Sequence, residues 1–113
     1  MNCNPYFHKV TALTASDTAV EMTVTNSTNI SNLDYFELVL CVCPSSVVTG
    51  EPLPYTININ GTAVPLLNKY SLPINTNRLH TRKRYYGAYV EGATAADTYV
   101  ILWNTPDWPQ FAV

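Results

Sequence analysis

The segment NRLHTRKRYYGAYV, residues 77–90, concentrates the side chains of this chain that could bind a partner. The sequence has six Lys and Arg residues, and four of them fall within seven positions here: Arg78, Arg82, Lys83 and Arg84. Three tyrosines follow in the same segment: Tyr85, Tyr86 and Tyr89. Guanidinium groups bind phosphates and carboxylates, and tyrosine rings pack on bases, sugars or apolar protein surfaces. The segment therefore raises three hypotheses: nucleic acid, glycan or protein.

Nucleic acid is the least supported of these partners. Domains that bind nucleic acid are usually basic, whereas this chain has a net charge of −2. Three arginines on phosphates would give a salt slope of only about −3, although the tyrosines could stack on bases. We therefore do not expect nucleic acid as a partner.

A glycan remains an open alternative, because aromatic ring faces pack well on sugars. The chain offers six such rings in and around the segment: Tyr70, Tyr85, Tyr86, Tyr89, Trp103 and Trp108. Most of them alternate into the expected interiors of strands, which weakens this hypothesis.

A protein interface is the third hypothesis, since Arg and Tyr are enriched among the residues that dominate binding energy. The segment from Arg78 to Val90 reads as one long strand. Alternate side chains of a strand share a face, which would create a basic ladder on one side: Arg78, His80, Arg82 and Arg84. The carboxylates that meet this ladder could belong to the chain itself or to a neighbouring subunit, and both alternatives stay open.

Metal and catalytic chemistry have little support in the spacing of the polar side chains. The three cysteines are Cys3, Cys41 and Cys43. A zinc site with one histidine can be drawn, but the C-x-C spacing does not match the usual pattern, so we expect buried free thiols. The chain has no G-x-S-x-G elbow, P-loop or dinucleotide-binding fingerprint. We expect no enzymatic activity, no cofactor and no metal.

The low charge of the chain bears on how its surface is used. Charged residues make up 12% of the 113 residues, about half of the ~25% that is usual for globular domains. Such a surface has little electrostatic protection against association. The protein is therefore either a neutral, exposed domain or one whose surface is covered in an assembly.

The elements that must position the segment are strands. Alternating or β-branched runs predict strands at 6–13, 18–25, 34–43, 55–59, 62–64, 78–90 and 97–104. Asn60-Gly61 supplies the two positive-φ positions of a type I′ hairpin. The run 34–43 is apolar on both faces after Glu37, which predicts a strand covered on both sides. We expect one all-β domain over residues 1–113, a sandwich or barrel of about seven to eight short, mostly antiparallel strands.

The C-terminal residues 105–113 carry two further aromatic side chains, Trp108 and Phe111. Two prolines favour an extended conformation for this tail. It could fold back over a sheet edge or act as an arm that docks on a neighbour. At the other end, Met1 is followed by neither a basic start nor an apolar run, so we expect synthesis in a cytoplasm. No stretch approaches 18 apolar residues, so we expect no membrane partner.

A resemblance to known proteins rests on four motifs: NSTNISNLDYFELVLCVC, PLPYTININGTAVPLLNKYSLPI, NRLHTRKRYYGAYV and YVILWNTP. These motifs resemble a group of short β-rich proteins encoded with the structural genes of tailed bacteriophages and prophages of gut bacteria. The resemblance covers most of the chain, from Asn2 to Pro106. It implies a capsid-associated or decoration protein of the virion, without enzymatic activity, and it transfers no site residues.

We therefore expect a virion structural protein, made in the host cytoplasm, that acts through protein–protein contacts. Its expected partners are the major capsid protein or other virion proteins, and further copies of itself as a homo-oligomer. The candidate interface comprises Arg78, Arg82, Arg84, Tyr85, Tyr86, Tyr89, Trp108 and Phe111. The alternative is a carbohydrate-binding or host-recognition β-sandwich module.

Overall fold

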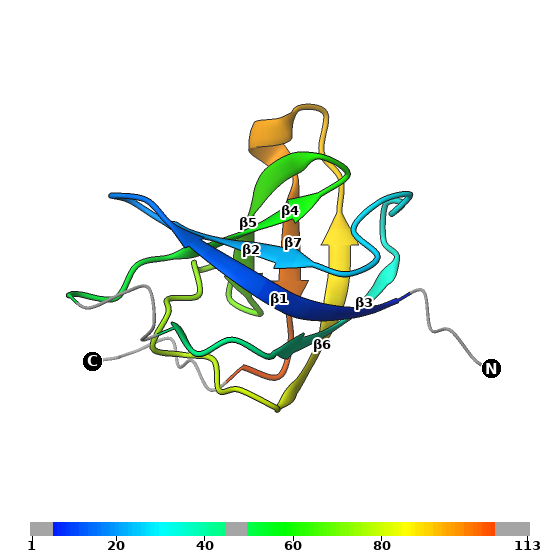
Figure 1. Ribbon diagram of the computed structural model, residues 1–113. Helices are drawn as coiled ribbons and strands as arrows, with labels where there is room; N and C mark the ends of the chain where they lie inside the picture. Colours follow the sequence, from blue (N-terminus) through cyan, green and yellow to red (C-terminus); the bar gives the residue numbers. More distant parts are fainter. Residues whose placement is uncertain (1–5, 45–49, 106–113) are drawn as a thin grey trace.

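Seven strands close into a barrel in the computed structural model, which describes residues 6–44 and 50–105 (Figure 1). The strands are β1 (Phe7–Ala15), β2 (Val20–Val24), β3 (Tyr35–Leu40), β4 (Tyr55–Ile59), β5 (Thr62–Asn68), β6 (Arg84–Val90) and β7 (Tyr99–Leu102). One short 3-10 helix, η2 (Ala95–Asp97), precedes β7. The predicted all-β fold is confirmed, and of the two expected architectures, sandwich and barrel, the chain forms the barrel.

The barrel is mixed in strand direction. Its order is β1-β2-β4-β5-β7-β6-β3, and β3 returns to β1. Four neighbouring pairs are antiparallel: β1–β2, β3–β6, β4–β5 and β6–β7. Three pairs are parallel: β1–β3, β2–β4 and β5–β7. Closure leaves each of these strands hydrogen-bonded on both sides, so the barrel presents no free sheet edge.

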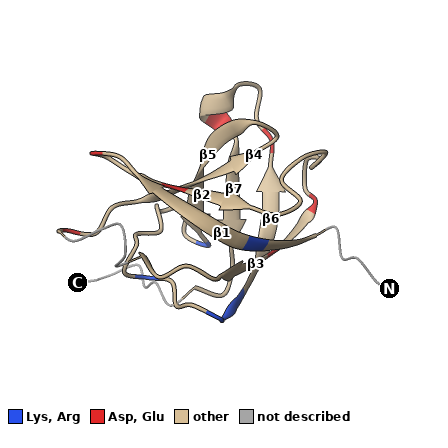
Figure 2. Cartoon of the chain, viewed as in Figure 1, with Lys and Arg blue, Asp and Glu red and all other residues tan. Residues whose placement is uncertain are grey.

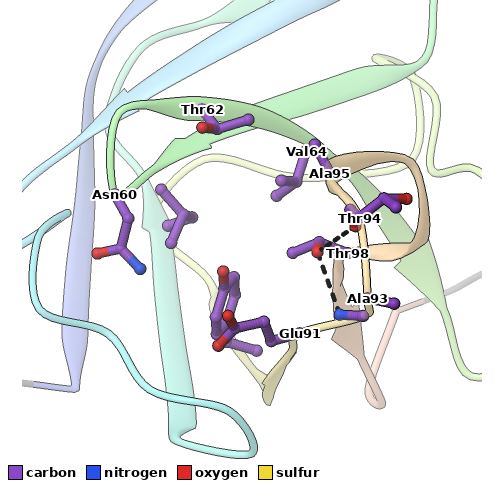
Figure 3. Close-up of a pocket in the computed structure, with 11 residues that line it drawn as sticks. Asn60, Thr62, Val64, Glu91, Ala93, Thr94, Ala95 and Thr98 are labelled. Atoms are coloured by element: carbon purple, nitrogen blue, oxygen red, sulfur yellow. Dashed lines mark hydrogen bonds between the residues drawn. The ribbon is translucent and has the colours of Figure 1, made fainter.

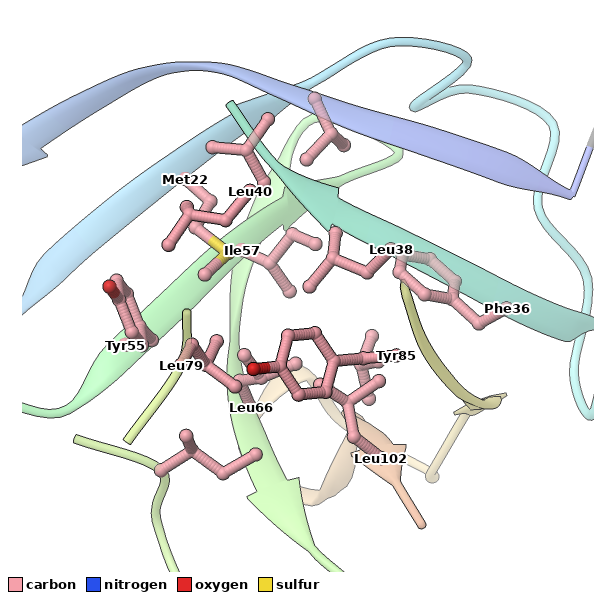
Figure 4. Packing of buried hydrophobic residues seen from close by; sticks show 14 of the residues in the cluster. Met22, Phe36, Leu38, Leu40, Tyr55, Ile57, Leu66, Leu79, Tyr85 and Leu102 are labelled. Carbon is pink, nitrogen blue, oxygen red and sulfur yellow. The ribbon is translucent and has the colours of Figure 1, made fainter. Parts of the chain in front are cut away.

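Alternate side chains of every strand fill the barrel interior (Figure 4). In β3, Phe36, Leu38 and Leu40 are fully buried, while Tyr35 and the residues that alternate with it face outward. Each fully buried side chain of this kind stabilises the fold by roughly 1.5–3 kcal/mol. The prediction that this strand is covered on both faces is wrong, because only one side of a barrel strand faces the core.

The β4–β5 hairpin follows the sequence prediction closely. Ile59 pairs with Thr62 across a two-residue turn in which Asn60 has φ 55° and Gly61 has φ 84°. These are the left-handed values that a type I′ turn requires. The Asn60 side chain also ties the turn to a distant loop, because it accepts from the Ile30 N–H (3.1 Å) and donates to the Ile30 carbonyl (2.9 Å).

Candidate protein interface

The basic segment is shorter as a strand than its alternation predicts. Strand β6 begins at Arg84, and residues 78–83 form bends and turns instead. Arg82 has a left-handed φ of 67°, and its N–H donates to the Leu40 carbonyl at the end of β3 (3.0 Å). This path buries Leu79 in the core. The predicted ladder of side chains along one strand face is therefore wrong, since burial of Leu79 overrides the local pattern.

Arg84 is paired with a carboxylate of its own chain. Its guanidinium lies 2.8 Å from Glu37 on the neighbouring strand β3, and 4.9 Å from the centre of the Phe7 ring. The Arg84 side chain is 55% exposed, whereas that of Glu37 is only 12% exposed. An exposed pair of this kind contributes about 0.2–1 kcal/mol. The pair and the contact with the Phe7 ring also restrict where the Arg84 side chain lies on the outer surface.

Arg78 and Arg82 are exposed on the turns that lead into β6. Among the residues that the structure describes, no hydrogen bond or ion pair joins the Arg82 guanidinium to another group. Arg82 is thus a charged side chain at a fixed backbone position that is available to a partner.

Two of the three tyrosines are not available to a partner. Tyr85 and Tyr89 are 0% and 5% exposed, because they occupy the inward positions of β6. The Tyr85 hydroxyl accepts from the His80 N–H (2.8 Å) and so anchors the turn before the strand. Their proposed role as contact residues is therefore wrong. The other two aromatic candidates, Trp108 and Phe111, lie with most of the proposed 105–113 arm outside the described residues.

Tyr86 belongs to an exposed group of rings that we call the aromatic face: Tyr6, Tyr35, Tyr86 and Trp103. The Tyr35 ring lies 6.4 Å from that of Tyr86 at an interplanar angle of 22°. The Tyr6 ring lies 6.4 Å from that of Tyr35 at 72°. The Trp103 N–H donates to the Tyr86 carbonyl (2.7 Å), which continues the β6–β7 pairing and places the two residues side by side.

These four side chains are 38–48% exposed on one outer surface of the barrel. Aromatic pairs at such distances and angles attract each other by about 0.5–1.5 kcal/mol, so the rings support one another. Large exposed rings that are held in place match the composition of protein interface cores. Alternation along the strands correctly separates Tyr35 and Trp103 from the neighbouring residues that enter the core. That both side chains point outward and lie on adjoining strands becomes clear only from the barrel.

The cysteines differ from their predicted environment. Cys41 and Cys43 are exposed, because β3 ends at Leu40 and the chain leaves the barrel wall there. The prediction of buried thiols is wrong for both, and Cys3 lies outside the described residues. Within residues 6–44 and 50–105, no three His, Cys, Asp or Glu side chains form a group that could hold a metal ion.

His8 is a core residue of β1. Its ring stacks on that of Phe36 at 4.0 Å and 14°, and its Nδ1–H donates to the Thr25 carbonyl (2.9 Å). Burial lowers the pKa of the His8 imidazole, and the hydrogen bond to Thr25 opposes this shift only in part. The ring is therefore neutral at neutral pH and acts as a packed, hydrogen-bonded link between β1 and the end of β2.

A pocket of about 230 Å³ lies at the end of the barrel where β6 finishes (Figure 3). Its polar lining includes Asn60, Thr62, Tyr89, Glu91, Thr94 and Thr98. The Thr98 hydroxyl donates to the Thr94 carbonyl (2.9 Å) and accepts from the Gly92 N–H (3.1 Å). These bonds fix the wall formed by residues 92–98, so the pocket is preformed.

No family model, curated protein or solved structure matches this chain. In the described ranges, no helix has the length and apolar character needed to cross a bilayer. The resemblance to phage structural proteins therefore stays a prediction, and the functional proposal rests on the geometry of the aromatic face.

Proposed function

We propose that this chain is a non-enzymatic structural component of a bacteriophage virion, a capsid-associated or decoration protein that acts through protein–protein contacts. The aromatic face is the observation that carries the proposal. Rigid Tyr and Trp rings supply large contact areas at a low cost in conformational entropy, and they dominate binding energy at interfaces. Burying this face against a capsid protein removes four exposed rings from water.

One standard interface would cover only part of the surface of this molecule, which leaves room for further contacts. A standard interface buries about 800 Å² on each partner. The whole chain exposes 6369 Å², so one such contact would cover roughly an eighth of its surface. The charged residues, 12% of the chain, leave little repulsion to oppose close packing at high local concentration on a capsid.

The proposal is tested by co-sedimentation with purified bacteriophage capsids. We expect the wild type to co-sediment. The double variant Tyr86→Ser/Trp103→Ser should bind at least about tenfold more weakly, because it removes two contact rings worth 1 kcal/mol or more each. Both side chains point outward, so circular dichroism should show an unchanged fold.

Tyr70→Ser is the matched control, because Tyr70 is also an exposed tyrosine (43%) but lies in the loop after β5, outside the aromatic face. We expect it to bind as the wild type does. A protein that stays monomeric in light scattering and does not bind capsids would contradict the proposal.

A carbohydrate-binding or host-recognition module is the second candidate function. It is favoured by Trp103, whose large ring is 48% exposed beside Tyr86, as a sugar-stacking platform requires. A glycan array distinguishes the two functions. Glycan binding that is lost in Trp103→Ser, together with no binding to capsids, would favour this alternative.

A further inference from the structure

Strand β6 separates two groups of opposite charge. Arg82 and Lys83 directly precede the strand, and Glu91 directly follows it. A strand of seven residues is roughly 20 Å long at about 3.3 Å per residue. The two groups therefore lie at opposite ends of the barrel.

The end of the barrel where β6 finishes is acidic. Asp34 lies there, because its carbonyl accepts from the Tyr89 N–H (3.1 Å), and Asp97 lies in η2. The segments that build this end, 26–34, 60–61 and 91–98, contain no Lys or Arg. In Figure 2, red segments mark η2 and the end of β6, and blue marks the bend where β6 begins; further red segments lie at the left, away from β6.

The opposite end carries most of the positive charge: Lys69, Arg78, Arg82, Lys83 and Arg84. Asp17 and Glu51 belong to the same end, but they lie at the β1–β2 hairpin and before β4, across the barrel from β6. Arg84 is already paired with Glu37. Arg82 is therefore the arginine best placed to meet another molecule.

The pocket at the acidic end has the features of an arginine site. Its volume of about 230 Å³ is large enough for one long side chain. Within the described residues, the Glu91 carboxylate has no hydrogen bond or ion pair, and its N–H is held by the Asn32 side chain (2.8 Å). Arginine presents five N–H donors in a fixed fork, and carboxylates and hydroxyls such as those of Glu91, Thr62 and Tyr89 accept such bonds.

We infer that the pocket receives the Arg82 side chain of a second copy, so that copies of the chain associate head to tail. This inference rests on the proposed structural function and specifies one of its partners. Donor and acceptor surfaces lie on different parts of the molecule, so the contact is heterologous and builds a ring or an open row. The charge asymmetry along β6 orients the approaching copies and fixes their direction.

Charge reversal provides the test. We expect wild-type self-association, measured by light scattering over a concentration series, to weaken as salt is raised, because salt screens the contact. Arg82→Glu and Glu91→Arg should each weaken it by at least about tenfold. Mixing the two variants in equal amounts should restore association, because the intact Arg82 of one variant meets the intact pocket of the other.

Matched controls carry the same charge changes elsewhere. Lys9→Glu alters an exposed residue of β1, and Glu51→Arg alters one that shares the end of Arg82 but lies across the barrel from β6. Both should associate as the wild type does. Arg82→Asn is a second variant that removes the charge with a residue that tolerates a left-handed backbone, so it keeps the turn. It should also weaken association.

The inference is overturned if the mixed variants fail to associate while the wild type does, or if the controls lose association equally. A wild type that stays monomeric but binds capsids through its aromatic face would overturn the inference and leave the proposed function standing. Association that depends on Arg82 and Glu91, with no binding to capsids, would support the inference and contradict the proposed function.

Discussion

The hydroxyl of Tyr55 is buried in the core and has no hydrogen-bond partner among the described residues. Burial raises the pKa of this phenol, and the nearby Tyr85 and Cys43 side chains add to the shift. An unpaired buried hydroxyl costs about 1–3 kcal/mol relative to one that keeps its hydrogen bonds. The buried ring of Tyr55 therefore stabilises the fold, whereas its hydroxyl group destabilises it.

Tyr55→Phe should therefore leave the free energy of unfolding unchanged or raise it by about 1 kcal/mol, as measured by urea denaturation. Tyr85→Phe is the matched control, because the Tyr85 hydroxyl accepts from the His80 N–H and its loss leaves that donor unpaired. We expect the control to lower stability by about 1 kcal/mol. A Tyr55→Phe variant that is clearly less stable than the wild type would show that the hydroxyl has a partner in the folded protein.

His8 predicts a pH dependence of stability. Its pKa is lowered in the folded state, so the unfolded chain binds more protons and stability falls as pH drops. The contribution of neutral His8 to the free energy of unfolding is fully present above pH ~6.5, the pKa of an unfolded histidine. Below that pH it is lost progressively, at up to about 1.4 kcal/mol per pH unit, until the folded-state pKa is reached. Urea denaturation between about pH 5 and 8 measures this slope.

His8→Phe should flatten the profile in that range, because it removes the titrating ring and keeps a flat group against Phe36. His80→Gln changes the exposed histidine and is the control, which should keep the slope of the wild type. An unchanged slope in His8→Phe would assign the pH dependence to other groups.

At the scale of elements, β6 and β7 approach each other so closely that there is no room for a side chain at one position of β6. A Cβ atom at Gly87 would collide with the backbone carbonyl of Ile101 on β7. Backbone atoms of a paired strand cannot move aside without loss of hydrogen bonds. Gly87 therefore fixes the spacing of β6, which carries Tyr86, and β7, which directly precedes Trp103.

Gly87→Ala should lower the free energy of unfolding by more than about 2 kcal/mol, measured by chemical denaturation, because overpacking costs 1–3 kcal/mol and ladder bonds are lost in addition. Gly50→Ala is the control, since a Cβ there meets nothing within 4 Å. We expect no loss of stability for the control. Equal stability of both variants would show that β7 can shift away from β6.

Some of these elements could be predicted from the sequence, and others could not. Local signals give the β4–β5 hairpin and the buried positions of β2 and β3, because a turn type and a period of two depend on neighbouring residues only. The parallel pairs β1–β3, β2–β4 and β5–β7 join distant segments, and periodicity does not specify neighbours. The aromatic face spans β3, β6 and β7, so it becomes visible only with the strand order.

Residues 78–83 show the same limit in a single segment. Their alternation fits a strand, but the burial of Leu79 and the left-handed turn at Arg82 are set by contacts with the core and with Leu40. Alternation likewise placed Cys41 and Cys43 on a covered face, and the early end of β3 exposes them. Tertiary contacts outweigh β propensity at such positions.

At the scale of the whole molecule, the two proposed surfaces do not overlap. The aromatic face lies on the outer side of β3, β6 and β7, and the charged contact lies at the two ends of the barrel. One copy could thus bind a capsid through its side and neighbouring copies through its ends. The two contacts would then act together on an extended surface.

This arrangement predicts cooperative binding to capsids at low salt. A titration followed by co-sedimentation should give a sigmoidal curve for the wild type. Arg82→Glu should give a simple hyperbolic curve with binding to isolated sites retained, because it removes only the contact between neighbours. A hyperbolic curve for the wild type would contradict the prediction, and Lys9→Glu is the control that should stay sigmoidal.

The Asn60-Gly61 turn also sets how the protein ages. Glycine has no side chain to hinder attack of its backbone nitrogen on the side-chain amide of the preceding Asn. The Asn side chain in Asn-Gly sequences therefore readily loses ammonia and forms a cyclic imide, which water then opens. The two hydrogen bonds to Ile30 hold the Asn60 amide and should slow this reaction in the folded state. Mass spectrometry of stored samples should therefore find deamidation at Asn60 more slowly in native than in urea-unfolded protein. Each such event replaces the donor to Ile30 with a carboxylate at the rim of the pocket, so an old molecule would differ from a new one where copies are proposed to meet.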